Sequence, residues 1–305
     1  MGAADIIPGV SGGTVALILG IYRRLINALS SFDTTLLGLL RQRRLRDAFA
    51  HVDLRFLISL LFGIAAGLFL LADLMTNLLT TSETRPYTLA AFFGLILASG
   101  ILVGRMVGRW SPVTVVLVAL GAAVAYKLTG LHGTAYDASE GPPYGYLFLC
   151  GVIGISAMIL PGISGAFILL LLGIYLYVIE ALRSVKQIVH GTFPAAENVA
   201  IIAVFAAGCA VGLLLFSKIL RWLLAHHEPP TMALLCGFML GSLRKIWPFK
   251  EDLTPDREFK FKEFDNITPP HFDGQVWLVI AIAIAAAAFV FVLDRVARSR
   301  GAEIE

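Results

Sequence analysis

ADIIPGVSGGTVALILGIYRRLINAL, residues 4–29, returns later in the chain as AMILPGISGAFILLLLGIYLYVIEAL, residues 157–182. At this fixed offset, 14 of the 26 aligned positions are identical, and they include the elements P-G-x-S-G and G-I-Y. Apolar composition alone can match leucine to leucine, but it does not align proline, glycine, serine and tyrosine at one offset. The chain therefore contains an internal duplication.

The similarity between the two parts continues beyond these stretches. GIAAG at residues 63–67 of the first part corresponds to GCAVG at residues 208–212 of the second. Residues 90–99 share an alanine, a glycine, a leucine and a serine in register with residues 233–242. Small residues spaced four apart allow helix backbones to approach each other closely within a membrane. We therefore expect equivalent helices at equivalent places in the two parts.

Composition indicates that these helices lie in a membrane. Of the 305 residues 58% are hydrophobic and only 15% are charged, whereas a soluble domain carries roughly a quarter charged residues. The long apolar runs do not alternate, which favours helices over the strands of a barrel. We predict an all-α, polytopic membrane protein with three transmembrane helices after each PGxSG element. The expected spans are 56–79, 87–105, 112–130, 199–224, 231–247 and 275–293.

Lysine and arginine favour cytoplasmic loops, so their positions predict orientation. The loop at residues 30–55 carries five arginines and the segment after Leu293 carries three, which places both in the cytoplasm. Residues 131–144 contain acids but no lysine or arginine, which suits the outside. Segment 144–182 then begins and ends outside, whereas its counterpart begins and ends inside. The two repeats, residues 1–143 and 144–305 of one integral-membrane domain, are thus expected to be inverted.

Each PGxSG element predicts a break at membrane depth. Proline and glycine interrupt a helix, and the following serine and glycine suit the start of a new half-helix. Segment 144–182 either crosses the membrane twice or returns as a re-entrant hairpin. The free N–H groups of a half-helix attract anions, although a tight packing kink is the structural alternative. We predict that both breaks face one polar cavity that binds a phosphate or carboxylate through Ser11, Gly12, Gly13, Thr14, Ser164 and Gly165.

Three cations and one acid complete the candidate site. Arg244 and Lys245 end an apolar span, where they either form a cationic mouth or reach the interface beside Trp247. Arg85 is the nearest cation in the first repeat. Asp5 precedes the first break and has no acidic counterpart in the second repeat, so we predict it as the proton-coupling residue.

Several function classes find no support in the sequence. A net charge of +3 is too small to indicate nucleic-acid binding. No nucleotide-binding, catalytic or CxxC motif is present, so we expect no enzyme activity and no cofactor. The adjacent His226 and His227 indicate a solvated turn and no metal site, and the three cysteines fall within apolar segments. Met1 is not followed by a basic stretch, so no signal peptide is expected.

The motifs DIIPGVSGGT at residues 5–14, PGISG at residues 161–165 and GSLRKIWP at residues 241–248 resemble those of bacterial and archaeal polyprenyl-phosphate transporters. The resemblance covers essentially the whole chain. It implies translocation of undecaprenyl phosphate from the outer to the inner leaflet of the cytoplasmic membrane, for re-use in cell-wall synthesis. In one departure, only seven residues precede Pro8, where the family has a basic apolar stretch. The start has been trimmed or the first repeat is shorter.

Three hypotheses for function follow. The first is a gradient-driven transporter of polyprenyl phosphate in the inner membrane, surrounded by membrane lipids and compatible with a homo-oligomer. The second is a secondary transporter of a small soluble anion, which would use the same half-helix geometry. The third is a lipid-phosphate enzyme, for which the sequence offers no nucleophile or acid–base set.

Overall fold

In the computed structural model, four helices are long and apolar enough to cross a membrane, counted over the residues that the structure describes. They are α7 (Arg85–Met106), α8 (Pro112–Thr129), α12 (Ala196–His226) and α14 (Gly274–Gly301). A fifth results if α5 (Leu45–His51) and the first part of α6 (Leu54–Thr80) count as one span, although this pair is bent by 60°. The prediction of a mainly helical, multi-pass membrane protein is confirmed.

The structure describes residues 1–2, 12–131, 142–186, 196–254, 264–269 and 273–301. All six expected spans coincide with helices of this part of the chain. The span expected at 231–247 is the shortest, because α13 (Glu228–Ser242) has 15 residues and continues as the 3-10 turn η2 (Leu243–Ile246). The membrane orientation of these helices, and with it the inversion of the repeats, stays a prediction.

Both PGxSG elements lead into half-helices that end in the same way. In the first repeat α2 (Gly12–Ile18) precedes α3 (Tyr22–Ser30), and in the second α10 (Gly165–Leu171) precedes α11 (Tyr175–Lys186). The chain turns between them at Gly20 and at Gly173, with φ of 68° and 75°. Glycine adopts this left-handed conformation without the steric cost of a side chain. The shared local geometry extends the sequence repeat to the backbone.

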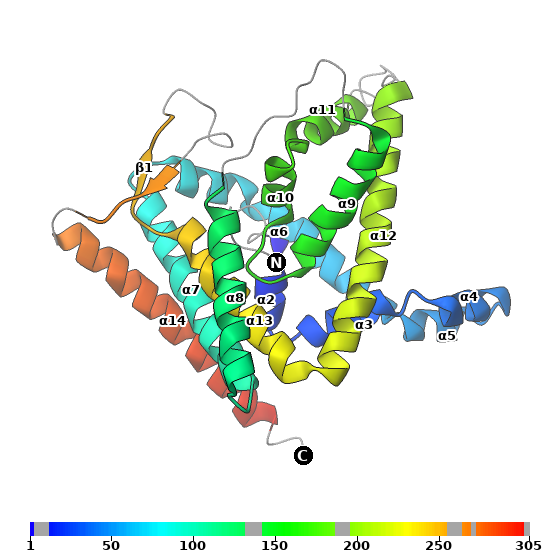
Figure 1. Cartoon of the computed structure of the whole chain (residues 1–305), viewed down its shortest axis with the longest axis horizontal. Helices are drawn as coiled ribbons and strands as arrows, with labels where there is room; N and C mark the ends of the chain where they lie inside the picture. Colours follow the sequence, from blue (N-terminus) through cyan, green and yellow to red (C-terminus); the bar gives the residue numbers. More distant parts are fainter. Residues whose placement is uncertain (3–11, 132–141, 187–195, 255–263, 270–272, 302–305) are drawn as a thin grey trace.

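Helix α9 (Tyr144–Ile159) and α10 form an antiparallel hairpin (Figure 1). The Tyr146 hydroxyl at the start of α9 donates to the Leu172 carbonyl oxygen just after α10, at 2.8 Å. At the start of α10, the backbones approach so closely that a Cβ on Gly165 would lie 2.7 Å from the Gly154 carbonyl oxygen. Of the two alternatives for segment 144–182, the structure therefore has the chain double back at the PGISG turn.

The core lies where α13 packs between α7 and α8. Glycine permits this contact, because a Cβ on Gly121 of α8 would lie 2.6 Å from the Leu234 carbonyl oxygen. Helix α14 packs along α7, and α12 packs along α9 and α3. Helix α2 enters the same core through Ala16. The fully buried side chains of this core include Tyr22, Ile96, Leu235, Met239 and Ile246.

A short antiparallel hairpin of β1 (Lys250–Asp252) and β2 (Phe264–Asn266) was not predicted. We expected a solvated loop over residues 248–275. Two hydrogen bonds hold the hairpin against the helical body: Trp247 Nε1 donates to the Ile267 carbonyl oxygen at 2.9 Å, and Asn266 Nδ2 donates to the Arg244 carbonyl oxygen at 2.8 Å. Such side-chain contacts leave no hydropathy pattern, so the sequence did not reveal them.

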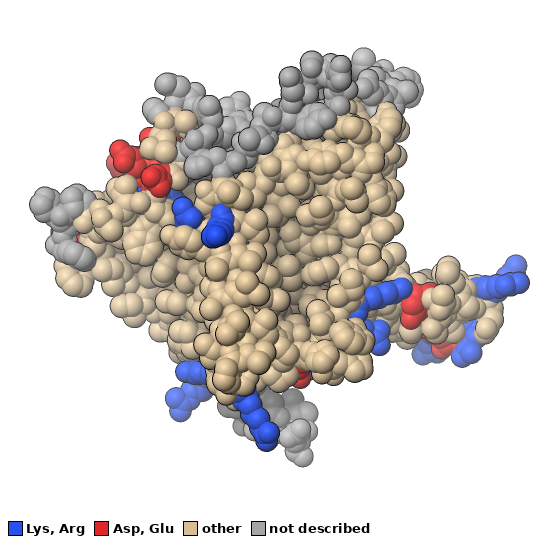
Figure 2. Space-filling model, in the orientation of Figure 1, with Lys and Arg blue, Asp and Glu red and all other residues tan. Residues whose placement is uncertain are grey.

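Charged side chains gather at two opposite edges of the molecule. The C-terminal end of α14 and the α12–α13 turn lie at the lower edge, and the β hairpin lies at the upper edge (Figure 1). Lysine and arginine dominate the lower edge and the arm of α4 (Thr34–Arg41) and α5, whereas acidic and basic side chains lie together at the hairpin (Figure 2). The broad uncharged band between the edges is the surface that a bilayer would cover.

Candidate functional site

Helix α2, which follows the first PGxSG element, meets the second element inside the protein. Thr14, fully buried in α2, accepts a hydrogen bond at its hydroxyl from the N–H of Gly162 at 2.9 Å. One residue earlier, a Cβ on Gly13 would lie 2.6 Å from the Ile159 carbonyl oxygen. That carbonyl also accepts a hydrogen bond from the buried Tyr22 hydroxyl at 3.2 Å. Segments 148 residues apart in sequence thus form one junction.

Only some of the candidate residues contribute to this junction. Gly12 is buried at the start of α2, next to Gly13 and Thr14. Gly165 packs against α9 and therefore stabilises the α9–α10 hairpin instead of contacting α2. Ser11 and Asp5 lie outside the described residues, and their candidate roles stay predictions.

Ser164 and Lys245 line one pocket beside the junction. Its walls come from the PGISG turn, from α10, from the end of α8 and from η2, and it is a small pocket with an enclosed volume of about 10 Å³. The lining residues are Ala125, Leu128, Thr129, Gly162, Ile163, Ser164, Phe167, Ile168 and Lys245. Hydroxyl groups and one ammonium group therefore lie among apolar side chains, an arrangement suited to a lipid with a charged headgroup.

The polar side chains of the pocket are Thr129, Ser164 and Lys245, and the Thr129 hydroxyl donates a hydrogen bond to the Ala125 carbonyl oxygen at 2.8 Å. Within the described part of the chain, no hydrogen bond involves the Ser164 hydroxyl and no ion pair involves Lys245. The Lys245 ammonium lies 4.5 Å from the centre of the Phe167 ring, a contact that orients the cation without neutralising it. A cation in this state attracts an anionic group.

Two further cationic side chains, Arg244 and Lys250, lie near Lys245. Arg244 donates from Nη1 to the Tyr126 carbonyl oxygen at 3.1 Å and lies over the Tyr126 ring. Lys250, in β1, donates from Nζ to Asn266 Oδ1 at 2.7 Å. Burial, followed by repulsion from Lys245, lowers the pKa of Lys250 to about 8, although the nearby Asp265 opposes this shift. Lys250 is thus close enough to Lys245 and Arg244 to sense their charges, and we call these three residues the cation cluster.

Arg85 lies apart from the pocket. Its guanidinium donates to the carbonyl oxygens of Leu79 and Thr80 at 2.7 and 2.9 Å, and so it caps the end of α6. It also lies over the ring of Phe264 in β2, 4.8 Å from its centre. Arg85 therefore supports the hairpin that carries Lys250, and its role in substrate binding stays a prediction.

Sequence reasoning missed Lys250, Thr129 and Phe167. Lys250 follows Lys245 by five residues, but it belongs to a segment in which acids outnumber bases, so its charge did not stand out. Thr129 and Phe167 sit within apolar runs and become notable only because the fold brings α8 to α10. Among the described residues, no group of three His, Cys, Asp or Glu side chains is arranged to hold a metal ion.

Comparison with known proteins identifies the family of the chain. Residues 1–260 match a family model described as "VCA0040-like: Undecaprenyl phosphate translocase-like". A Vibrio cholerae protein named polyprenyl-phosphate transporter is 36% identical, over 97% of this chain and 94% of that protein. A Staphylococcus aureus protein of the same name is 31% identical, over 81% of this chain and 83% of that protein. No solved structure matches the chain. With a family match over most of its length, this chain belongs to the undecaprenyl phosphate translocase-like family of membrane transporters.

Proposed function

We propose that the protein moves polyprenyl phosphate, in bacteria undecaprenyl phosphate, from the outer to the inner leaflet of the cytoplasmic membrane. The observation that carries this proposal is the pocket in which Ser164 and Lys245 lie together among apolar side chains. A phosphate headgroup accepts hydrogen bonds from a hydroxyl and an ammonium group. The names of the two relatives indicate the same class of substrate.

The apolar lining explains how a long prenyl tail can be accommodated. Leu128, Ile163 and Phe167 surround the polar groups of the pocket. Only the headgroup has to leave the lipid–water interface, because the tail is as soluble in the bilayer as the side chains themselves. The transporter then needs no wide aqueous pore, and its main task is to compensate the phosphate charge during the crossing.

The proposed direction follows from the two charged edges. The cation cluster lies at the edge of the β hairpin, and the arginine-rich arm and α12–α13 turn lie at the other edge (Figure 2). The positive-inside rule favours the arginine-rich edge as cytoplasmic. The pocket beside the cation cluster would then collect headgroups from the outer leaflet, and the C-terminus would be cytoplasmic.

Inverted repeats supply a mechanism for alternating access. Their support is reciprocal packing: Gly94 of α7 would clash with the Ala283 carbonyl oxygen of α14 if it carried a Cβ, and the equivalent Gly237 of α13 would clash with the Val118 carbonyl oxygen of α8. Each second span therefore packs on the third span of the other repeat. We propose that the two repeats rock about the junction of Thr14 with Gly162.

We infer that the transport step uses an ion or proton gradient, because the sequence holds no ATP-binding motif. Asp5 is the proposed proton-coupling residue, since a carboxyl group near membrane depth can have a pKa in the physiological range. The test is transport against pH for the native protein and for Asp5→Asn. If the variant keeps both the rate and the pH dependence of the native protein, Asp5 carries no coupling role.

Transport between leaflets tests the proposed substrate. Labelled undecaprenyl phosphate is placed in one leaflet of proteoliposomes and its appearance in the other is followed, with inorganic phosphate and glycerol phosphate as competitors. We expect protein-dependent movement that the soluble phosphates do not inhibit. Inhibition together with uptake of a soluble phosphate would identify a transporter of small anions, and release of inorganic phosphate from polyprenyl diphosphate would identify an enzyme.

A further inference from the structure

The arm of α4 and α5 projects beside the helical body (Figure 1). It connects α3 to α6, yet no residue of α4 is buried and Ala48 is the only buried residue of α5. The arm therefore adds little to the core of the described structure. Its exposed surface needs another explanation.

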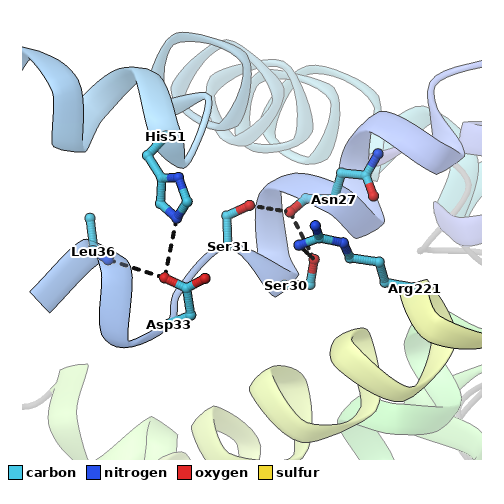
Figure 3. Close-up of polar contacts among 7 residues, drawn as sticks. All are labelled: Asn27, Ser30, Ser31, Asp33, Leu36, His51 and Arg221. Carbon is cyan, nitrogen blue, oxygen red and sulfur yellow. Dashed lines mark hydrogen bonds and ion pairs between the residues drawn. The ribbon is translucent and has the colours of Figure 1, made fainter.

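A polar network fixes the base of the arm (Figure 3). Asp33 Oδ1 accepts a hydrogen bond from the Leu36 N–H at 3.1 Å, which caps α4, and contacts His51 Nε2 at the end of α5 at the same distance. The hydrogen bond from Leu36, assisted by His51, lowers the pKa of Asp33. The two short helices are thus joined through one ionised carboxylate.

A second set of hydrogen bonds ties the end of α3, where the chain enters the arm, to the helical body (Figure 3). Arg221 of α12 donates from Nη1 to the Ser30 hydroxyl at 3.2 Å, at the end of α3 (Figure 3). On the other side, Asp53 adopts a left-handed conformation with φ of 48° where α5 meets α6. The resulting 60° bend turns α5 away from the axis of α6. The arm is held at an angle to this span instead of prolonging it.

The surface of the arm combines apolar and basic side chains. Leu37 is 66% exposed and Leu45 is 52% exposed, and Leu40 and Phe49 are similarly open. Asp47 is the one carboxylate in the sequence between Thr34 and His51, and it pairs with Arg44 at 2.7 Å. Open leucines beside an excess of basic residues are typical of helices that lie in a membrane interface. Four exposed arginines lie among the apolar side chains, namely Arg41, Arg43, Arg44 and Arg46.

We propose that the α4–α5 arm lies in the headgroup layer of the leaflet at the C-terminal edge and binds anionic phospholipid. The apolar side chains enter the boundary of the acyl chains, and the arginines contact phosphate groups. The arm is at the same edge as the basic α12–α13 side of the molecule (Figure 2), so the leaflet is within its reach. Anionic lipids of a cytoplasmic leaflet attract such clusters of basic residues.

The arm offers a suitable position for a reporter. A Cβ on Gly38 of α4 would meet no described atom within 4 Å, so Gly38→Cys is expected to carry a fluorophore without disturbing the fold. The full-length variant is placed in nanodiscs of phosphatidylcholine, with or without phosphatidylglycerol. Brominated lipids then quench a probe in the bilayer interface, and iodide quenches a probe in water. The native chain, treated with the same label, gives the background from its three cysteines.

We expect stronger quenching by brominated lipid, and weaker quenching by iodide, when phosphatidylglycerol is present. Replacing all four arginines with glutamine should abolish this difference, whereas replacing them with lysine should retain it. High salt should also reduce the difference for the native arginines, which tests the charge effect without a mutation. Equal thermal unfolding of the variants checks that the body is intact.

Two outcomes would overturn the proposal. Quenching by brominated lipid that is the same in both nanodiscs would mean that apolar contacts alone hold the arm, without anionic lipid. A probe that stays open to iodide in both nanodiscs would place the arm in water, with its exposed face free for a soluble protein partner.

Discussion

At the scale of single residues, the pocket joins what the sequence predicted to what only the fold could add. Ser164 and Lys245 were separate candidates 81 positions apart, and the structure brings them to one pocket. The repeated motif identified the first, and the end of an apolar span identified the second. Neither pattern could show that they are neighbours, because the distance between them depends on the packing of α8, α10 and α13.

The first prediction concerns the charge of Lys245. In Lys245→Gln, the phosphate headgroup loses its ammonium partner, and we expect a half-saturating concentration of polyprenyl phosphate that is higher by about ten- to hundredfold, since a hydrogen bond to a charged group contributes about 1.5–3 kcal/mol. The measurement is the rate of leaflet exchange against substrate concentration. Lys127→Gln is the matched control, because Lys127 is exposed on α8 and does not line the pocket. An equal effect in both variants would refute a specific role for Lys245.

A second prediction follows from the pKa of Lys250, which is lowered to about 8. Below this pH the side chain adds a positive charge to the cation cluster, and above it that charge is lost. The substrate phosphate is already fully ionised there, because its second pKa is about 6. We therefore expect apparent affinity to fall as the pH rises through about 8.

Lys250→Arg tests this origin of the pH dependence. Arginine remains charged throughout this range, so the variant should keep its affinity above about pH 8. The lowered pKa of Lys250 also makes the stability of the native protein depend on pH. A lysine with a lowered pKa in the folded state destabilises the protein below about pH 8, and this penalty disappears as the pH rises toward the usual lysine pKa. A fall in affinity that is identical in the native protein and in Lys250→Arg would exclude Lys250 as its source.

At the scale of helices, hydropathy and the internal repeat predicted the long apolar helices and their order, whereas residues 30–55, expected as a loop, form the short helices α4 and α5. The expected spans match α6, α7, α8, α12, α13 and α14. The β hairpin was missed because tertiary hydrogen bonds from Trp247 and Asn266 determine it. The bend at Asp53 was missed as well, since a left-handed aspartate has no signature in hydropathy. The small residues predicted helix contacts correctly, because glycines lie where the backbones of two helices touch.

The third prediction tests this use of glycine at a helix contact. Gly121→Ala would place a methyl group 2.6 Å from the Leu234 carbonyl oxygen, so α8 and α13 must separate. We expect a loss of about 1–3 kcal/mol in the free energy of unfolding. Gly63→Ala is the control, because no described atom lies within 4 Å of the added methyl group. It should be neutral or stabilise α6 by up to about 1 kcal/mol through helix propensity.

Thermal unfolding of both variants in one detergent gives the comparison. A lower midpoint for Gly121→Ala than for Gly63→Ala supports close packing of α8 on α13. Equal midpoints would show that the two helices can relax without cost, and would remove the packing argument for the repeat at this contact.

At the scale of the whole molecule, the duplication links fold to transport. The Thr14–Gly162 hydrogen bond joins one repeat to the other at the centre, and Arg23 of α3 forms an ion pair with Glu228 of α13 at the C-terminal edge. The pocket opens beside the cation cluster, near the opposite edge. In our proposal, the repeats are closed around Arg23 and Glu228 while the pocket receives a headgroup, and they exchange these states during transport.

The sharpest test is to detect the headgroup in the pocket between Ser164 and Lys245. Phe167 lines this pocket, and p-benzoylphenylalanine in its place can be cross-linked to undecaprenyl phosphate in proteoliposomes by ultraviolet light. The same residue in place of Leu149, which is 55% exposed on α9, reports contact with bulk lipid. Mass spectrometry should find the polyprenyl phosphate adduct chiefly at position 167, and Lys245→Gln should remove it. Equal adducts at positions 167 and 149, or an adduct at 167 that is unchanged by Lys245→Gln, would show that this pocket is not where the headgroup binds.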